Sequence, residues 1–178
     1  MSATGPNKVT IRKLEMADVP DARLIEQESF ATPWSTAMFV LELTKSSSVC
    51  LGAEIDGELV GYLFATNYAA VWHVMNVSVL PSHRRAGVAS KLMAELFRLT
   101  DTDSKTQYTL EVRVSNTAAL EMYRRCGFRS AGTRPGYYAD NREDALIMWC
   151  SNDPKFTPPN AGDPNEWSPD GGRRAGHA

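Results

Sequence analysis

Three β-rich runs follow one another in the middle of the chain, and helical patterns lie on both sides of them. Residues 49–55 and 59–68 flank Asp56-Gly57, a dipeptide typical of a tight hairpin turn, and a third run covers residues 71–80. Helical patterns cover residues 19–30, 36–45, 88–99 and 117–126, and further strands are predicted at 9–14, 107–114, 128–131 and 145–150. Strand–helix–strand units need crossover connections, so this order predicts an α/β domain with a mixed central sheet and helices on both faces. A doubly wound sheet is disfavoured because a three-strand meander lies in its middle.

The composition is that of an ordinary globular domain. The chain has 178 residues, of which 43% are hydrophobic and 22% charged, with a formal net charge of −2. It has no apolar run long enough to span a bilayer, no apolar stretch typical of a signal peptide and no basic excess typical of nucleic-acid binding. Cys50, Cys126 and Cys150 lack metal-ligand spacing. We therefore expect a cytoplasmic protein without a disulfide framework, a metal, a membrane or a nucleic-acid partner.

The last 28 residues differ from the rest of the chain. Residues 151–178 contain 5 Pro and 4 Gly, and their only large apolar residues are Phe156 and Trp167. Such a composition buries too little apolar surface to offset the entropy of ordering. We expect a folded domain over residues 1–150 and a flexible tail over 151–178, with a docking segment anchored by Trp167 as the alternative.

Charge is distributed unevenly along the folded part. Residues 1–83 have a net charge of −4, whereas residues 84–134 have a net charge of +5. Two explanations fit this asymmetry equally well: a solvated surface without a binding role, and a polyanionic ligand bound by the middle of the chain. The motifs in residues 84–134 therefore have to decide between a solvated surface and a ligand site.

Residues 77–90, VSVLPSHRRAGVAS, predict an anion-binding site. A strand ends in a short loop that contains Arg84 and Arg85, and Gly87 then opens a helix. The first N–H groups of a helix lack internal partners and lie at the positive end of its dipole, and neighbouring small residues let phosphate oxygens approach them. The chain contains neither a P-loop nor the glycine fingerprint of a dinucleotide fold, so we expect a pyrophosphate cradle of another kind.

A second group of residues follows in the next strand and helix. Glu111 lies within an otherwise apolar strand, Asn116 is placed to cap a helix, and Tyr123 follows two helical turns later. Each has an ordinary alternative: an outward-facing carboxylate, a plain cap and a core tyrosine. Cys126 lacks a histidine at a recognisable spacing, so a cysteine nucleophile is disfavoured.

These segments together resemble a known family. The run VSVLPSHRRAGVASKLM is similar to the acetyl-CoA-binding motif of the GCN5-related N-acetyltransferase (GNAT) superfamily. The runs LEVRVSNTAALEMYRRCGF, GYYADNREDALIM and IEQESFATPWS resemble more narrowly the RimI family, whose members acetylate the N-terminal alanine of a small-subunit ribosomal protein. The similarity covers roughly residues 8–150.

The resemblance implies the GNAT acyl-CoA N-acyltransferase fold, acetyl-CoA as acetyl donor, a protein N-terminus as acceptor and no metal. It implies that Glu111 is the general base and Tyr123 the general acid, and that Trp34, Tyr137 and Tyr138 contact the acceptor. The alternatives are a lysine or small-molecule amine acetyltransferase of the same fold and a non-catalytic CoA-binding module. The residues implied to bind acetyl-CoA are Val77, Ser78, Val79, Arg84, Arg85, Ala86, Gly87, Val88, Ala89, Ser90 and Asn116.

Overall fold

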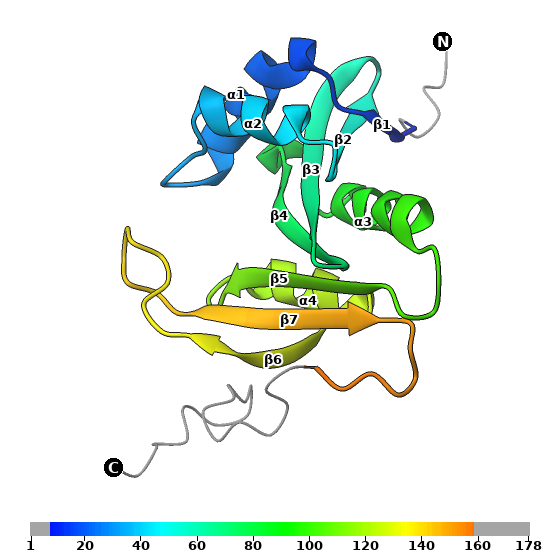
Figure 1. Ribbon diagram of the computed structural model, residues 1–178. Coiled ribbons are helices and arrows are strands. Elements are labelled where there is room, and N and C mark those ends of the chain that lie inside the picture. Colours follow the sequence, from blue (N-terminus) through cyan, green and yellow to red (C-terminus); the bar gives the residue numbers. More distant parts are fainter. Residues whose placement is uncertain (1–7, 159–178) are drawn as a thin grey trace. The chain divides into compact units, whose positions relative to one another are not determined.

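The computed structural model describes residues 8–158, which form two compact units (Figure 1). Unit 1 comprises residues 8–67 and 75–100, and unit 2 comprises residues 68–74 and 101–158. The elements are β1 (Thr10–Lys13), η1 (Met16–Asp18), α1 (Val19–Ser29), α2 (Thr36–Thr44), β2 (Ser48–Ile55), β3 (Glu58–Tyr68), β4 (Val71–Val79), η2 (Pro81–His83), α3 (Val88–Thr100), β5 (Gln107–Arg113), α4 (Thr117–Arg125), β6 (Arg129–Arg134) and β7 (Ala145–Ser151).

The strands form a mixed sheet in the hydrogen-bonded order β1-β2-β3-β4-β5-β7-β6. The pairs β1–β2, β2–β3, β5–β7 and β6–β7 are antiparallel, whereas β4 and β5 are parallel. This mixed topology confirms the predicted fold class.

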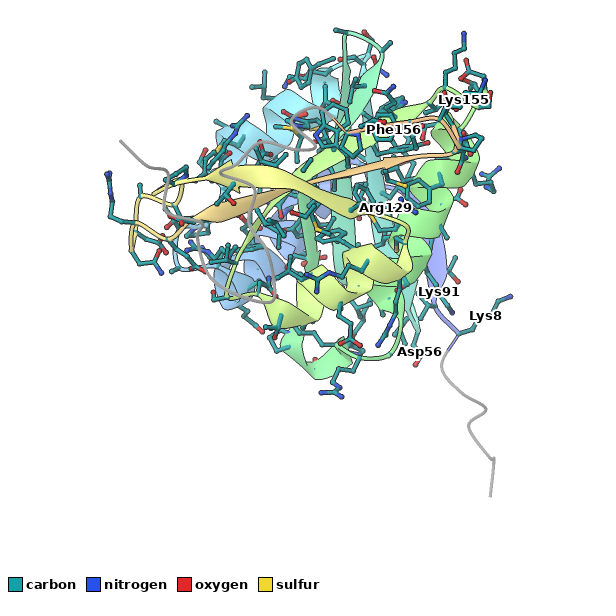
Figure 2. The ribbon with its side chains drawn as sticks, turned by 90° about the horizontal axis from the view of Figure 1, so that it is seen from below. Lys8, Asp56, Lys91, Arg129, Lys155 and Phe156 are labelled. Carbon is teal, nitrogen blue, oxygen red and sulfur yellow. The ribbon has the colours of Figure 1, made fainter. Side chains whose placement is uncertain are left out.

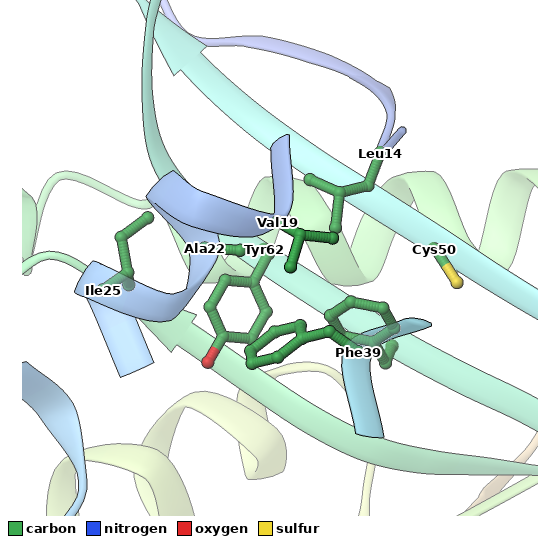
Figure 3. Close-up of a cluster of buried hydrophobic side chains, with 8 residues drawn as sticks. Leu14, Val19, Ala22, Ile25, Phe39, Cys50 and Tyr62 are labelled. Carbon is green, nitrogen blue, oxygen red and sulfur yellow. The ribbon is translucent and has the colours of Figure 1, made fainter. Parts of the chain in front are cut away.

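Unit 1 has helices on both faces of its strands. On one face, α1 and α2 enclose a cluster of buried side chains that includes Ile25, Phe39, Tyr62 and Phe64 (Figure 3). On the other face lies α3, and β3 reaches it through Gly61, where an added Cβ would lie 2.9 Å from Ser78 O and 3.3 Å from Val88 Cγ1. Any larger residue at position 61 would therefore collide with β4 and α3.

Two local features of unit 1 are the turn between β2 and β3 and the packed face of α3. Asp56 and Gly57 both have positive φ values, 53° and 84°, which suit the predicted tight hairpin between β2 and β3; Figure 2 labels Asp56 at this turn. In α3, Leu96 is buried, but Leu99 is 45% exposed and Thr100 is buried in its place. A spacing of four residues from Leu96 keeps position 100 on the packed face, so the buried stripe continues through Thr100.

In unit 2, α4 packs behind strands β5 and β7 in the view of Figure 1. The chain continues as ordered structure slightly beyond the expected domain boundary: β7 ends at Ser151, whose hydroxyl donates to Thr106 O at 3.1 Å. The Phe156 ring, labelled in Figure 2, lies 6.0 Å from the Trp149 ring. Residues 159–178 of the expected tail lie outside the described residues.

Two further findings concern the described residues as a whole. All three cysteines are free thiols. Within residues 8–158, none of the helices combines the length and the apolar character needed to cross a membrane.

Candidate active site

The loop between β4 and α3 has the backbone conformation expected of an anion cradle. Arg85 and Gly87 have positive φ values of 65° and 77°, and the helix begins with Lys91 N–H donating to Gly87 O at 3.0 Å. The N–H groups before Lys91 therefore precede the first internal bond of the helix. An added Cβ at Gly87 would meet nothing within 4 Å, so this face of the loop is open. A phosphate group fits these features.

The two loop arginines differ in their contacts. Arg84 donates from Nε to Val79 O at 3.0 Å and from Nη2 to Ser29 Oγ at 3.1 Å, and Ser78 Oγ donates to the same Ser29 hydroxyl at 2.7 Å. Arg84 thus connects β4 to the end of α1, a role that the sequence did not predict. Within residues 8–158, the side chain of Arg85 makes no hydrogen bond or ion pair, so its charge is available to a ligand.

A buried carboxylate holds the segment between α1 and α2. Glu26 is 2% exposed and accepts hydrogen bonds from the Tyr62 hydroxyl, from Asn76 Nδ2 at 3.1 Å and from Trp34 N–H at 2.8 Å. Burial and the neighbouring Glu26 carboxylate raise the pKa of Tyr62, so the phenol keeps its proton and remains the donor. Glu26 was missed from sequence because only the fold brings its donors together.

Trp34 lies beside this carboxylate and packs against the core of unit 1. Its ring is 5.6 Å from the Phe39 ring and 5.6 Å from the Phe64 ring. Ser35 caps α2 by accepting from Met38 N–H at 3.4 Å. The contacts of Trp34 are those of a packing residue, and its contact with an acceptor stays a prediction.

In unit 2, Glu111 is flanked by two basic side chains. Its side chain is 13% exposed, with Arg134 Nη1 at 3.2 Å from Oε1 and His73 Nε2 at 3.8 Å from Oε2. The strand register explains this arrangement: His73 is paired with Thr109 in the parallel β4–β5 ladder, and Glu111 lies two residues further along on the same face. Glu111 is thus neither a fully solvated carboxylate nor a fully buried one.

The two other residues of this group lie on α4. Asn116 caps the helix by accepting from Ala119 N–H at 3.2 Å, as predicted, and its amide NH2 group is the part suited to donate to a ligand. Tyr123 is 8% exposed and its ring lies 5.7 Å from that of Phe128. Burial raises the pKa of Tyr123, so its hydroxyl stays protonated.

A network of ionic contacts shapes the loop that contains Tyr137 and Tyr138. Arg113 donates to both carboxylate oxygens of Asp140 at 2.9 Å, and its guanidinium carbon lies 3.8 Å from the centroid of the Tyr138 ring. Burial raises the pKa of Tyr138 to about 12. Tyr137 is exposed, and the Arg134 guanidinium lies 5.6 Å from its ring centroid. Arg134 therefore contacts both the candidate base and one of the candidate acceptor-binding tyrosines.

Comparison with known proteins identifies the family of this chain. Residues 19–128 match the profile of the family described as "Acetyltransferase (GNAT) family". The chain belongs to this family. The membership predicted from the sequence is therefore confirmed.

Within the acetyltransferase family, this chain is similar to enzymes named as alanine N-acetyltransferases of a ribosomal protein. The [ribosomal protein bS18]-alanine N-acetyltransferase of Escherichia coli is 32% identical over 143 residues, which cover 78% of this chain and 95% of that protein. A Bacillus subtilis protein that bears a provisional form of the same name is 34% identical over 151 residues, 81% of this chain and 96% of the relative. The crystal structure of the Escherichia coli ribosomal-protein-S18-alanine N-acetyltransferase superposes with a TM-score of 0.75 at 31% identity, covering 81% of this chain and 94% of that one.

The structure also adds residues that the acetyltransferase motifs did not single out. His73 and Arg134 beside Glu111 come from strands that are distant in sequence, so only the sheet register reveals them. The sequence indicates these two residues only weakly, as a histidine in a predicted strand and a basic residue at the end of another. Among residues 8–158, no group of three or more His, Cys, Asp or Glu side chains is arranged to hold a metal ion.

Proposed function

We propose that this chain is an acetyl-CoA-dependent N-acetyltransferase that modifies the N-terminal α-amino group, with alanine as first residue, of a small-subunit ribosomal protein in the cytoplasm. The observation that carries the proposal is the 32% identity to the Escherichia coli [ribosomal protein bS18]-alanine N-acetyltransferase over 95% of that protein. The local geometry of both units supports it, as follows.

Unit 1 would hold the phosphates of the donor. Acetyl-CoA supplies an acetyl group as a thioester and carries a pyrophosphate. The N–H groups of residues 85–90, which precede the first internal bond of α3, and the guanidinium of Arg85, which has no partner within residues 8–158, suit that pyrophosphate. Arg84 would act from behind the loop, because its guanidinium is bonded to Val79 O and to Ser29. Backbone groups of Val77, Ser78 and Val79 would bind the donor arm.

Unit 2 would carry out the proton transfers. An α-amino group has a pKa of about 7.7–8.0, so much of it is protonated and non-nucleophilic at neutral pH. Glu111 would remove that proton, directly or through a water molecule, which makes the nitrogen a nucleophile. The buried hydroxyl of Tyr123, kept protonated by its raised pKa, would donate a proton to the departing sulfur.

The same unit would recognise the acceptor. Tyr137 is exposed, and Arg113 and Asp140 hold the loop that presents it. We assign contact with the peptide to Tyr137 and Tyr138 of this unit. In unit 1, Trp34 is also assigned to the acceptor, although its ring is largely used in packing. A preorganised loop lowers the entropy lost when the peptide binds.

The experiment is acetyl transfer from acetyl-CoA to a panel of peptides that begin with Ala, Ser, Met or Gly, together with a peptide whose only free amine is an internal Lys. Mass spectrometry reads the mass and the position of the added group. We expect transfer to the α-amine and fastest transfer to the Ala peptide. Transfer to the internal Lys alone would instead identify a lysine acetyltransferase, and binding of acetyl-CoA without any transfer would identify a non-catalytic module.

A further inference from the structure

The proposed reaction releases a proton that must reach solvent. An ammonium group and a thioester give an amide, a thiol and one proton, so each turnover leaves one proton on the enzyme. Glu111 would take it first, and its side chain is only 13% exposed. Glu111 must lose this proton before it can act again, and the groups around it decide where the proton goes.

The titratable and charged groups near Glu111 come from several elements. Arg134 lies on β6, Tyr138 on the loop between β6 and β7, and His73 on β4, while Tyr68 at the end of β3 packs its ring 6.4 Å from that of His73. The Arg134 guanidinium is permanently protonated and has no acceptor atom. The phenol of Tyr138 keeps its own proton, since its pKa is raised to about 12. An imidazole, in contrast, both accepts and releases a proton near neutral pH.

The position of His73 suits a proton acceptor. Its Nε2 atom lies 3.8 Å from Glu111 Oε2, a separation that one bridging water or a small side-chain rotation closes. Its side chain is 31% exposed, more than twice the exposure of Glu111. The printed pairs of the β4–β5 ladder end at His73 and Thr109, and Glu111 lies two residues beyond Thr109 on the same face of β5.

We propose that His73 relays the proton from Glu111 to solvent. The protonated carboxyl group passes its proton to Nε2, and Glu111 returns to its ionised form. The imidazolium releases its Nδ1 proton to bulk water or buffer, and exchange with solvent then moves the remaining ring proton from Nε2 to Nδ1, so that Nε2 can accept again. No bond other than N–H and O–H is made or broken, and no other reactant is needed. The inference rests on the proposed function, since it assumes that Glu111 is the base. His73 is a positioning and relay residue, because it acts through Glu111 and not on the substrates.

The test compares wild type, His73→Ala, His73→Gln and Glu111→Gln in a dilute buffer that lacks imidazole. We expect kcat of both His73 variants to fall about tenfold, a small share of what general acid–base catalysis contributes, while KM for acetyl-CoA stays within about twofold. Added imidazole at constant pH and ionic strength should restore kcat of His73→Ala towards that of wild type, because a diffusible base replaces the missing ring at an exposed position. In His73→Gln the glutamine side chain fills the space of the missing ring, so added imidazole should restore kcat less than in His73→Ala.

Each other outcome is decisive. Wild-type kcat in His73→Ala, or a loss that imidazole does not restore, overturns the relay while leaving the proposed function intact. Equal rescue of Glu111→Gln by imidazole would show that imidazole acts directly on the amine, which also overturns the relay. A wild-type protein that transfers no acetyl group, or a Glu111→Gln variant with full activity, overturns the base assignment and the relay together.

Discussion

The two units use their carboxylates in different ways. In unit 1, Glu26 and Glu42 are almost fully buried, and their oxygens accept hydrogen bonds from several donors; for Glu42 these are Lys45 Nζ at 2.5 Å, Thr66 Oγ1 at 2.7 Å and Ser48 Oγ at 3.1 Å. In unit 2, the ion-pair partners of Glu111 among residues 8–158 are Arg134 and the more distant His73. A buried carboxylate whose oxygens accept hydrogen bonds from several donors contributes to structure, whereas one with fewer donors keeps acceptor capacity for a group of the substrate.

The pKa of Glu42 illustrates how a structural carboxylate stays ionised. Burial by itself would raise the pKa, but hydrogen bonds from Lys45, Thr66 and Ser48 outweigh it, and the net pKa is lowered. Glu42 therefore stays ionised near neutral pH. The comparison therefore predicts that replacing the buried Glu26 or Glu42 affects stability and that replacing Glu111 affects activity.

The largest expected effect is on catalysis, for Glu111→Gln. Removal of a general base typically costs about 100-fold or more in rate, so we expect kcat for the Ala peptide to fall by at least about 100-fold. Stability should stay within about 0.5 kcal/mol, because glutamine preserves the shape. The control is Glu121→Gln on α4, whose exposed carboxylate pairs with Arg125. A large loss of stability with unchanged kcat would reverse the assignment of Glu111.

The second-largest expected effect is a loss of stability in Glu26→Ala. The substitution leaves the Tyr62 hydroxyl, the Asn76 amide and the Trp34 N–H without their acceptor, and we expect the free energy of unfolding to fall by about 3 kcal/mol. Urea denaturation measures it. Glu28→Ala, an exposed position on the same helix, should change stability by less than about 0.5 kcal/mol. Equal effects of the two variants would contradict a structural role for the Glu26 network.

A smaller change is expected for Tyr62→Phe. It removes one donor and leaves Glu26 with Asn76 and Trp34, so the expected loss of stability is about 1.5 kcal/mol, the usual cost of a hydrogen bond to a charged group. Combined with Glu26→Ala, the loss should be less than the sum of the two single effects, because both variants disrupt the same contact. Strictly additive losses would show that Tyr62 and Glu26 act independently.

The smallest effect concerns the ionic loop of unit 2 and is lost in acid. Hydrogen bonds from Ser115, Asn141 and Arg113 lower the pKa of Glu143 to about 2. A carboxylate whose pKa is lowered on folding stabilises the protein above the unfolded pKa of about 4.3, and that contribution disappears as pH falls towards about 2. Glu143→Gln should therefore be less stable than wild type from pH 7 to about pH 5, and the difference in urea midpoint should vanish between about pH 4 and pH 2. A difference that is independent of pH would exclude this linkage.

Local patterns in the sequence predicted much of the molecule. Asp56-Gly57 predicts its hairpin because few residues tolerate positive φ at both positions, and Asn116 predicts its cap because a short polar side chain reaches the N–H group three residues later. These features depend on neighbours within a few residues. Contacts with distant partners could not be predicted in this way: Arg84 donates to Val79 O and Ser29 Oγ, contacts that no local pattern indicates, and its place at the phosphates stays a prediction.

By itself, the sequence determined the order of strands and helices, the glycine-containing loop before α3 and the resemblance to the acetyltransferase family, because each is encoded in short-range backbone preferences and contiguous motifs. Only the tertiary structure decided which carboxylates are structural and which one is chemically available. Glu26, Glu42 and Glu111 each lie within an expected helix or strand, and no local pattern separates them. Their difference comes from the donors that other segments bring to them: hydroxyl, amide and N–H groups for Glu26, lysine and hydroxyl groups for Glu42, and a guanidinium and an imidazole for Glu111.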